Sequence, residues 1–243
     1  MSHKAIIYTR PFQALLRAAD DLLTSAYPYH KYIHKDKSFK IKDGELVNAA
    51  PRDIWQCEKS LCIGSFFANY AGVEAFINYI YLKYSKRTID TIPEEFFNSI
   101  ETRVIKLIRR KNFFDWNLEN RAYFVIPLVK EQPIKPSGIF DIGSDQWKRF
   151  KEVIEIRHSF IHPTQSETKI EITKVNDKLS MVNDSSPDNF WPLLNVARDH
   201  RILDYQATIA IRDTMLWILE KIASSIPEYI DPKILNQEDV KIL

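Results

Sequence analysis

An arginine and two histidines lie close together in residues 157–163, which read RHSFIHP. His162 directly precedes a proline, which forces its neighbour out of the helical region, so His162 is predicted to lie at a helix C-terminus. The helix dipole favours a protonated imidazole there, and an ordinary histidine pKa of about 6.5 allows the ring to act as acid or base near neutral pH. His162 is therefore a candidate acid or base, with His158 one turn before it.

Arg157 interrupts the apolar side of the predicted helix that contains it. At about 100° per residue, Trp147, Phe150 and Ile154 gather on one side of a helix over residues 145–161. Arg157 falls within that stripe, and an unpaired charge buried there would cost several kcal/mol. The guanidinium must therefore have a partner or face an aqueous cleft.

Arg157 and the two histidines also have two alternative explanations, a structural ion pair and a metal site. Glu74 is the only charged residue between Lys59 and Lys83, so a structural ion pair between Glu74 and Arg157 would account for both. His158 and His162 also have the i, i+4 spacing of two metal ligands. Because no glutamate follows the first histidine and no third ligand is evident, we predict neither a metal site nor another cofactor.

The segment from Arg157 to His162 resembles the R-x4-6-H motif of HEPN domains. In that family a polar residue commonly follows the arginine, as His158 does here. The long apolar segment 71–79, AGVEAFINY, also resembles the helix that faces the motif in HEPN proteins. The resemblance covers about residues 55–225.

The resemblance implies an endoribonuclease that cleaves RNA without a metal ion. It assigns Arg157 to stabilise the transition state and His162 to act as acid or base, with His158 as a supporting or second catalytic imidazole. Glu74 and Asn78 are the expected supporting residues. In this family a homodimer that brings two motif helices together would form the site. Because many HEPN proteins are toxins or antiviral defence effectors, an antitoxin or a defence partner is expected too. The alternative is a non-catalytic HEPN-like binding or scaffold module.

A run of cations without an intervening acid is the candidate RNA-binding segment. It comprises Arg103, Lys106, Arg109, Arg110 and Lys111. Such cations could bind phosphates of RNA, although a solvated helix face is the ordinary explanation of such a run. The formal net charge is only +2, so whether this segment binds RNA depends on its local charge.

Composition indicates a folded, mainly helical protein. Hydrophobic residues make up 45% of the chain, and its 5 glycines are too few for turn-dense β folds or glycine-rich phosphate loops. Cys57 and Cys62 have no zinc-like spacing, so we expect reduced core thiols in a cytoplasmic protein. The apolar stretch 61–82 carries Asn69, Glu74 and Asn78, which favours a core helix over a membrane span.

Periodicity and helix signals predict an all-α protein, an up-and-down bundle of about five main helices. A first helix is expected to begin at Pro11, and further helices are expected over residues 52–84, 91–110, 145–161 and 204–226. Residues 112–143 are expected to be mostly connection, with a possible short helix at 118–128. Small β-hairpin insertions are expected at 38–47 and 168–182. We predict one HEPN-like domain over residues 1–243, with a core at 55–225 and a peripheral tail at 228–243.

Overall fold

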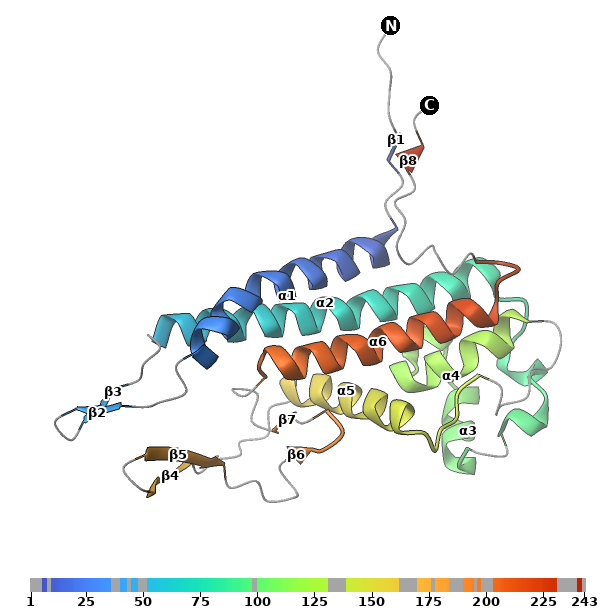
Figure 1. The fold of residues 1–243 in the computed structure, drawn as a ribbon. Coiled ribbons are helices and arrows are strands. Elements are labelled where there is room, and N and C mark those ends of the chain that lie inside the picture. The colour runs from blue at the N-terminus through green and yellow to red at the C-terminus, as the bar shows by residue number, and fades with distance from the viewer. Residues whose placement is uncertain are drawn as a thin grey trace, which may run out of the picture. The chain divides into compact units, whose positions relative to one another are not determined.

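The computed structural model describes most of the 243-residue chain. The described ranges are residues 6–7, 10–35, 40–42, 45–47, 52–97, 100–130, 139–161, 170–175, 178–183, 190–194, 196–197, 203–230 and 240–241. Within them the chain is mostly helical, which confirms the all-α expectation (Figure 1).

The α-helices of the described residues run in the order α1 to α6. They are α1 (Pro11–Lys35), α2 (Arg52–Tyr84), α3 (Thr102–Arg109), α4 (Leu118–Val129), α5 (Asp145–Ile161) and α6 (Tyr205–Ser225). Three short 3-10 helices separate α2 from α4: η1 (Ile89–Thr91), η2 (Glu94–Phe97) and η3 (Phe113–Asp115). The predicted helices at 52–84, 145–161 and 204–226 therefore correspond to α2, α5 and α6.

Short strands form four antiparallel pairs among the described residues. The pairs are β1 (Ile6–Ile7) with β8 (Val240–Lys241), β2 (Lys40–Lys42) with β3 (Glu45–Val47), β4 (Ile170–Val175) with β5 (Lys178–Asn183), and β6 (Phe190–Trp191) with β7 (Val196–Ala197). The residues between β2 and β3, and between β4 and β5, lie outside the described ranges. The hairpin insertions expected at 38–47 and 168–182 thus stay predictions.

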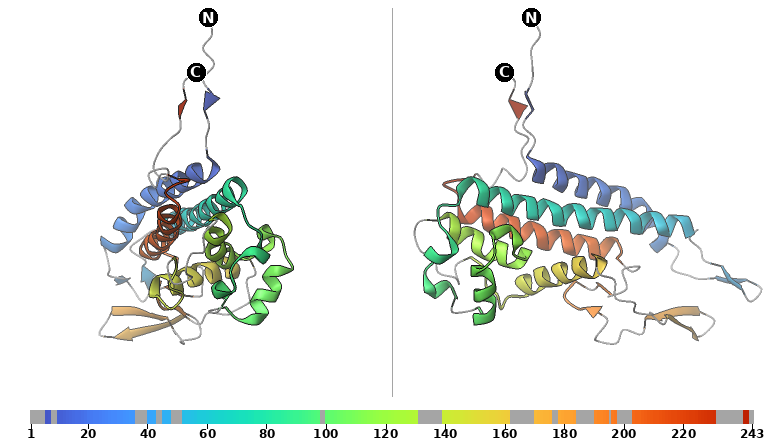
Figure 2. Two further views of the ribbon diagram at one scale, coloured as in Figure 1. Left: turned by 90° about the vertical axis from the view of Figure 1, so that its right-hand side faces the viewer. Right: turned by 180° about the vertical axis from the view of Figure 1, so that it is seen from behind.

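The chain divides into two compact units. Unit 1 comprises residues 1–17, 69–154 and 213–243, and unit 2 comprises residues 18–68 and 155–212. Helices α1, α2, α5 and α6 each contribute residues to both units. Within each unit, the segments of α1, α2 and α6 lie side by side (Figures 1 and 2).

Large apolar side chains fill the core of unit 1. The ring of Phe12 meets that of Phe76 edge to face, with 5.1 Å between centroids, and this contact packs α1 against α2. Gly72 lies beside Leu16, where an added Cβ would come within 2.9 Å of the leucine side chain. The close approach of the two helices at this point therefore depends on the missing side chain of Gly72.

Unit 2 is held by polar as well as apolar contacts between its helices. Ser65 of α2 donates a buried hydrogen bond of 2.8 Å to the main-chain oxygen of Ala19 in α1. Arg212 of α6 pairs with Asp20 of α1 at 2.5 Å. Together these contacts link α1 to both other helices in this unit.

The predicted continuous helix from 91 to 110 is wrong. Arg109 pairs with Glu94 at 2.9 Å, although a straight helix would separate residues fifteen apart by about 22 Å. η2 and α3 therefore do not form one straight helix, and Phe96 and Phe97 of η2 are both buried. Local start signals could not reveal this, because contacts with residues distant in the sequence, such as that of Phe97 with Phe124, contribute to it.

The possible short helix at 118–128 within residues 112–143 is confirmed. α4 extends over Leu118–Val129, and its residues 121–129 are all buried. Asn117 caps this helix by accepting a hydrogen bond of 2.8 Å from the N–H of Asn120. Pro127 lies inside the last turn of α4 and does not end the helix.

Candidate functional site

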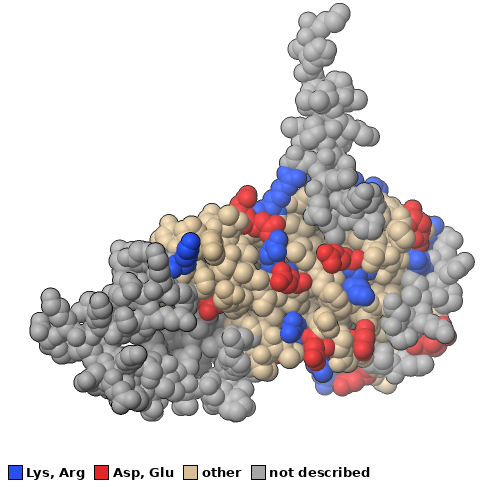
Figure 3. Space-filling model, in the orientation of Figure 1, with Lys and Arg blue, Asp and Glu red and all other residues tan. Residues whose placement is uncertain are grey.

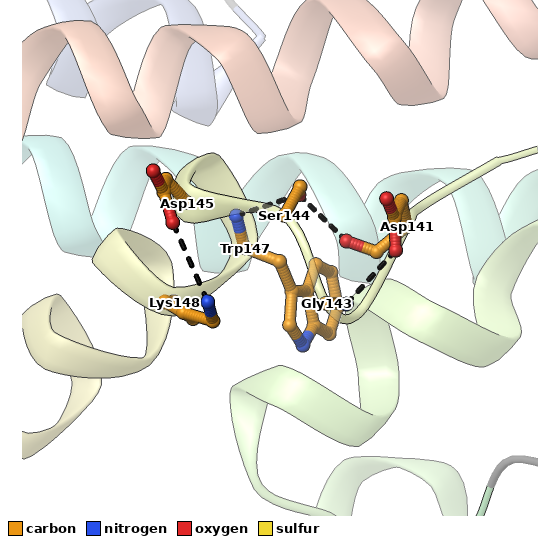
Figure 4. A network of polar contacts seen from close by, with 6 residues as sticks. All are labelled: Asp141, Gly143, Ser144, Asp145, Trp147 and Lys148. Carbon is orange, nitrogen blue, oxygen red and sulfur yellow. Dashed lines mark hydrogen bonds and ion pairs between the residues drawn. The ribbon is translucent and has the colours of Figure 1, made fainter.

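The helix that carries the predicted motif begins at a well-formed cap (Figure 4). The Ser144 hydroxyl donates to the main-chain oxygen of Asp141 at 2.6 Å and accepts from the N–H of Trp147 at 3.3 Å. The Asp141 side chain in turn accepts from the N–H of Gly143 at 2.9 Å. Ser144 is therefore the N-cap of α5, and it sets where the helix starts.

The buried face of α5 is rotated from the predicted stripe. Trp147, Phe150, Val153 and Ile156 are each at most 2% exposed. Ile154, which the periodicity placed in the stripe, is only half-buried, and Ile161 at the end of the helix is 44% exposed. A helical wheel cannot distinguish an isoleucine that enters the core from one at the end of the helix, because the neighbouring helices determine which side chains are buried.

The structure places two of the three predicted catalytic residues on α5. Arg157 is half-buried and has at least one interaction with another group, and His158 is exposed. His162, the predicted acid or base, lies outside the described residues. Arg157 and His158 thus stand at the C-terminal end of one helix, within unit 2.

Aromatic and polar contacts hold this end of α5. The ring of Phe160 lies 5.5 Å from that of Phe66 and 5.3 Å from that of Phe67, both on α2. The indole N–H of Trp191 donates to Glu155 at 3.1 Å. These contacts position the turn of the helix that bears Arg157 and His158.

The predicted supporting residues Glu74 and Asn78 form a network in unit 1 with a residue that sequence reasoning missed. Arg121 of α4 donates from Nη2 to Oε1 of Glu74 and, at 2.9 Å, from Nη1 to Oδ1 of Asn78. Arg121 is 6% exposed, and its Nε has no hydrogen-bond partner among the described residues. The available signal was that Arg121 is the only cation in the otherwise largely apolar sequence of α4.

Unit 2 contains a buried carboxylate that was likewise not predicted. Glu58 of α2 is 2% exposed, and its Oε1 lies 2.8 Å from Nδ1 of His30 in α1. The His30 ring stacks on Tyr205 with 4.9 Å between centroids. Because a buried carboxylate requires compensation, this histidine satisfies Glu58 and joins α1 to α2.

The two cysteines differ from the expectation of two core thiols. Cys62 is buried, and burial raises the pKa of its thiol from the ordinary 9.0 to about 12, although a hydrogen bond with Thr208 acts in the opposite direction. Cys57 is exposed, so the expectation is wrong for this residue. Five residues along a helix amount to about 500° of rotation, which turns the two thiols toward different sides.

The predicted RNA-binding cations all lie on exposed positions of α3 and the two residues after it. Arg109 pairs with Glu94 and also lies 5.0 Å from the ring centroid of Phe97. Cations and carboxylates are interspersed over the described part of the face that Figure 3 shows. Any contact with a polyanion would therefore be local, as the small net charge also indicates.

The described residues contain no group of three or more His, Cys, Asp or Glu side chains that could hold a metal ion. One helical segment, Ile54–Tyr84, is long and apolar enough to cross a membrane, and 50% of its most apolar window is buried inside the protein. Burial of that kind is also found in core helices of soluble proteins.

Comparison with known proteins identifies no relative of this chain. No family model, no curated protein and no solved structure matches it.

Proposed function

We propose that this protein is a metal-independent endoribonuclease of the HEPN type that acts as a homodimer. The observation that carries the proposal is the pair formed by half-buried Arg157 and exposed His158 at the end of α5, immediately before His162 in the sequence. A guanidinium and imidazoles in this order are the groups that the motif requires. The proposed fold is an up-and-down bundle of about five main helices with hairpin insertions.

The proposed reaction uses the ribose as nucleophile. An imidazole, assigned to His162, removes the proton of the 2′-hydroxyl, and the resulting oxygen attacks the adjacent phosphorus. The bond from phosphorus to the 5′-oxygen breaks, and a second imidazole, assigned to His158, protonates that leaving oxygen. Arg157 stabilises the negative charge that develops on the phosphoryl oxygens. The products are a 2′,3′-cyclic phosphate and a 5′-hydroxyl.

The spacing within the motif supports a dimer. On one ideal helix, positions 157 and 162 are about 140° apart in rotation and about 7.5 Å apart along the axis. A single helix therefore brings the guanidinium and the imidazole together poorly. Two copies related by a two-fold axis would supply converging groups from both helices.

Incubation of labelled RNA with the purified protein in EDTA tests this proposal. We expect cleavage that leaves 2′,3′-cyclic phosphate ends, and no cleavage of DNA of the same sequence. His162→Ala should lower the cleavage rate by about 100-fold or more without changing the melting temperature. Arg149→Ala, which removes an exposed arginine nearer the start of α5, is the control and should cleave normally.

A different outcome would support the non-catalytic alternative. If the wild-type protein leaves RNA intact in EDTA and His162→Ala lowers the melting temperature, the motif has a structural role. The protein is then a HEPN-like binding or scaffold module. Arg157→Ala distinguishes the two less well, because both accounts predict damage.

A further inference from the structure

Phe114 is an exposed aromatic ring held in a fixed position directly after the basic segment of α3. Its side chain is 46% exposed, whereas its neighbour Phe113 is 4% exposed. Phe113 therefore does the core packing in η3, and Phe114 presents its ring to solvent.

Neighbouring aromatic rings restrain Phe114. It meets Tyr81 edge to face at 5.6 Å and Phe113 edge to face at 5.7 Å. Phe113 in turn stacks on Tyr81 with 3.9 Å between centroids and an angle of 6° between the planes. A ring supported from two sides loses little conformational entropy when a ligand stacks on it.

Trp116 joins this aromatic group to the end of α3. Its indole N–H lies 3.1 Å from the main-chain oxygens of both Ile108 and Lys111. The Trp116 side chain is buried and lies 5.3 Å from the ring of Phe113. The position of Phe114 is thereby coupled to the C-terminal turn of α3 and to the cations there.

The five cations of residues 103–111 differ in their ion pairing. Arg109 pairs with Glu94, but Arg103, Lys106, Arg110 and Lys111 have no ion-pair partner in the part of the chain that the structure describes. All four are exposed. Lys111 precedes Phe114 by three residues, which limits their Cα separation to about 11 Å. The nearest acid in the sequence, Asp115, is exposed as well.

We infer that Phe114 is a stacking platform for a base of single-stranded nucleic acid, whose phosphates contact the unpaired cations at positions 103, 106, 110 and 111. Unpaired cations attract a polyanion, and a fixed exposed ring binds the flat face of any base. A run of cations without an acid, as in residues 103–111, matches the repeated phosphates of a nucleic acid better than a protein surface of mixed charge. The inference rests on the proposed function for the identity of the ligand, and it assigns a residue for binding, separate from the motif on α5.

Binding of two deoxy strands of equal length separates stacking from phosphate contacts. One is a thymidine strand of about ten nucleotides, and the other has the same backbone with abasic sugars. Neither has a 2′-hydroxyl, so neither can undergo the proposed cleavage during the measurement. Fluorescence anisotropy at low salt gives the dissociation constant of each strand.

The expected results assign separate roles to the ring and to the cations. Phe114→Ala should weaken binding of the thymidine strand about tenfold and leave the abasic strand unchanged, whereas Phe114→Tyr should retain the affinity. Lys106→Ala should weaken both strands and reduce the slope of log K against log salt by about 0.7. Leu107→Ala, which removes an exposed apolar side chain of α3, is a control that should bind both strands normally.

Several outcomes would overturn the inference. Equal effects of Phe114→Ala on both strands, no effect on either, or a loss of equal size in Leu107→Ala would show that no base stacks on this ring. Failure of the wild-type protein to bind the thymidine strand would do the same. If the Phe114 results hold but RNA is not cleaved, only the endoribonuclease proposal fails; if RNA is cleaved without any dependence on Phe114, only the stacking platform fails.

Discussion

Arg121 of α4 binds Glu74 of α2, and through this contact an almost fully buried guanidinium is neutralised by a carboxylate that is 33% exposed. Asn78, one turn after Glu74, accepts from the second terminal nitrogen of the same guanidinium. Because a guanidinium only donates hydrogen bonds, it fixes which atom of the Asn78 amide faces it. This network joins two helices of unit 1.

Removal of Glu74 should destabilise the protein. Glu74→Ala would leave the Arg121 charge buried without its carboxylate, and we expect the free energy of unfolding to fall by about 1–3 kcal/mol. Urea denaturation followed by circular dichroism measures this change. Asp20→Ala breaks the more exposed pair with Arg212 and should cost less than about 1 kcal/mol.

The double variant Glu74→Ala with Arg121→Met identifies the cause of that loss. If the unpaired charge is responsible, an apolar side chain of similar length should restore most of the stability. A double variant that is less stable than Glu74→Ala would show that Arg121 stabilises the fold through other contacts.

The two described glycines of α2 should respond differently to alanine. At Gly72 the new Cβ would lie 2.9 Å from Leu16, whose side chain is buried, and we expect a loss of about 1–2 kcal/mol from overpacking. At Gly64 the nearest atom is the end of the Leu22 side chain at 3.2 Å, so the helix propensity of alanine should offset the contact and stability should change by less than about 1 kcal/mol. Thermal unfolding of both variants checks the difference. Equal losses would mean that the two sites are packed alike.

The thiols should react at different rates in the folded protein. Cys57 is exposed, whereas Cys62 is buried with its pKa raised to about 12. Only the thiolate reacts readily with a disulfide reagent, so titration at pH 8 should modify one thiol in the folded protein and both in urea. Cys57→Ser should abolish the fast reaction. A fast reaction that persists in this variant would show that Cys62 is accessible.

The raised pKa of Cys62 also predicts how stability depends on pH. Desolvation of the folded thiol raises its pKa from 9.0 to about 12, so the unfolded thiol ionises first as pH rises. Unfolding then releases a proton, and the stability present below pH 9.0 is lost through this window at about 1.4 kcal/mol per pH unit. The difference in unfolding free energy between wild type and Cys62→Ala should therefore shrink as pH rises from 9 to 11. A difference that is constant with pH contradicts this account.

The helices that were predictable carry strong local signals. α5 has a serine cap and a proline just beyond its end, and α2 is apolar around most of its circumference, as expected for a helix surrounded by others. The fold of residues 89–116 was not predictable in the same way. There the pairing of Arg109 with Glu94 and the capping of α3 by Trp116 depend on residues brought together by a reversal of the chain.

The candidate site likewise has a part that the sequence predicts and a part that it does not. Arg157, His158 and His162 stand within six residues of each other, so the sequence by itself determined the motif, the helix that bears it and the class of chemistry that it suggests. Only the tertiary structure decided that Arg121 binds Glu74, that His30 satisfies Glu58 and that Phe114 faces solvent while Phe113 is buried. Helix signals arise from neighbouring residues, whereas these contacts join residues from separate elements, and their free energy exists only once the chain has packed.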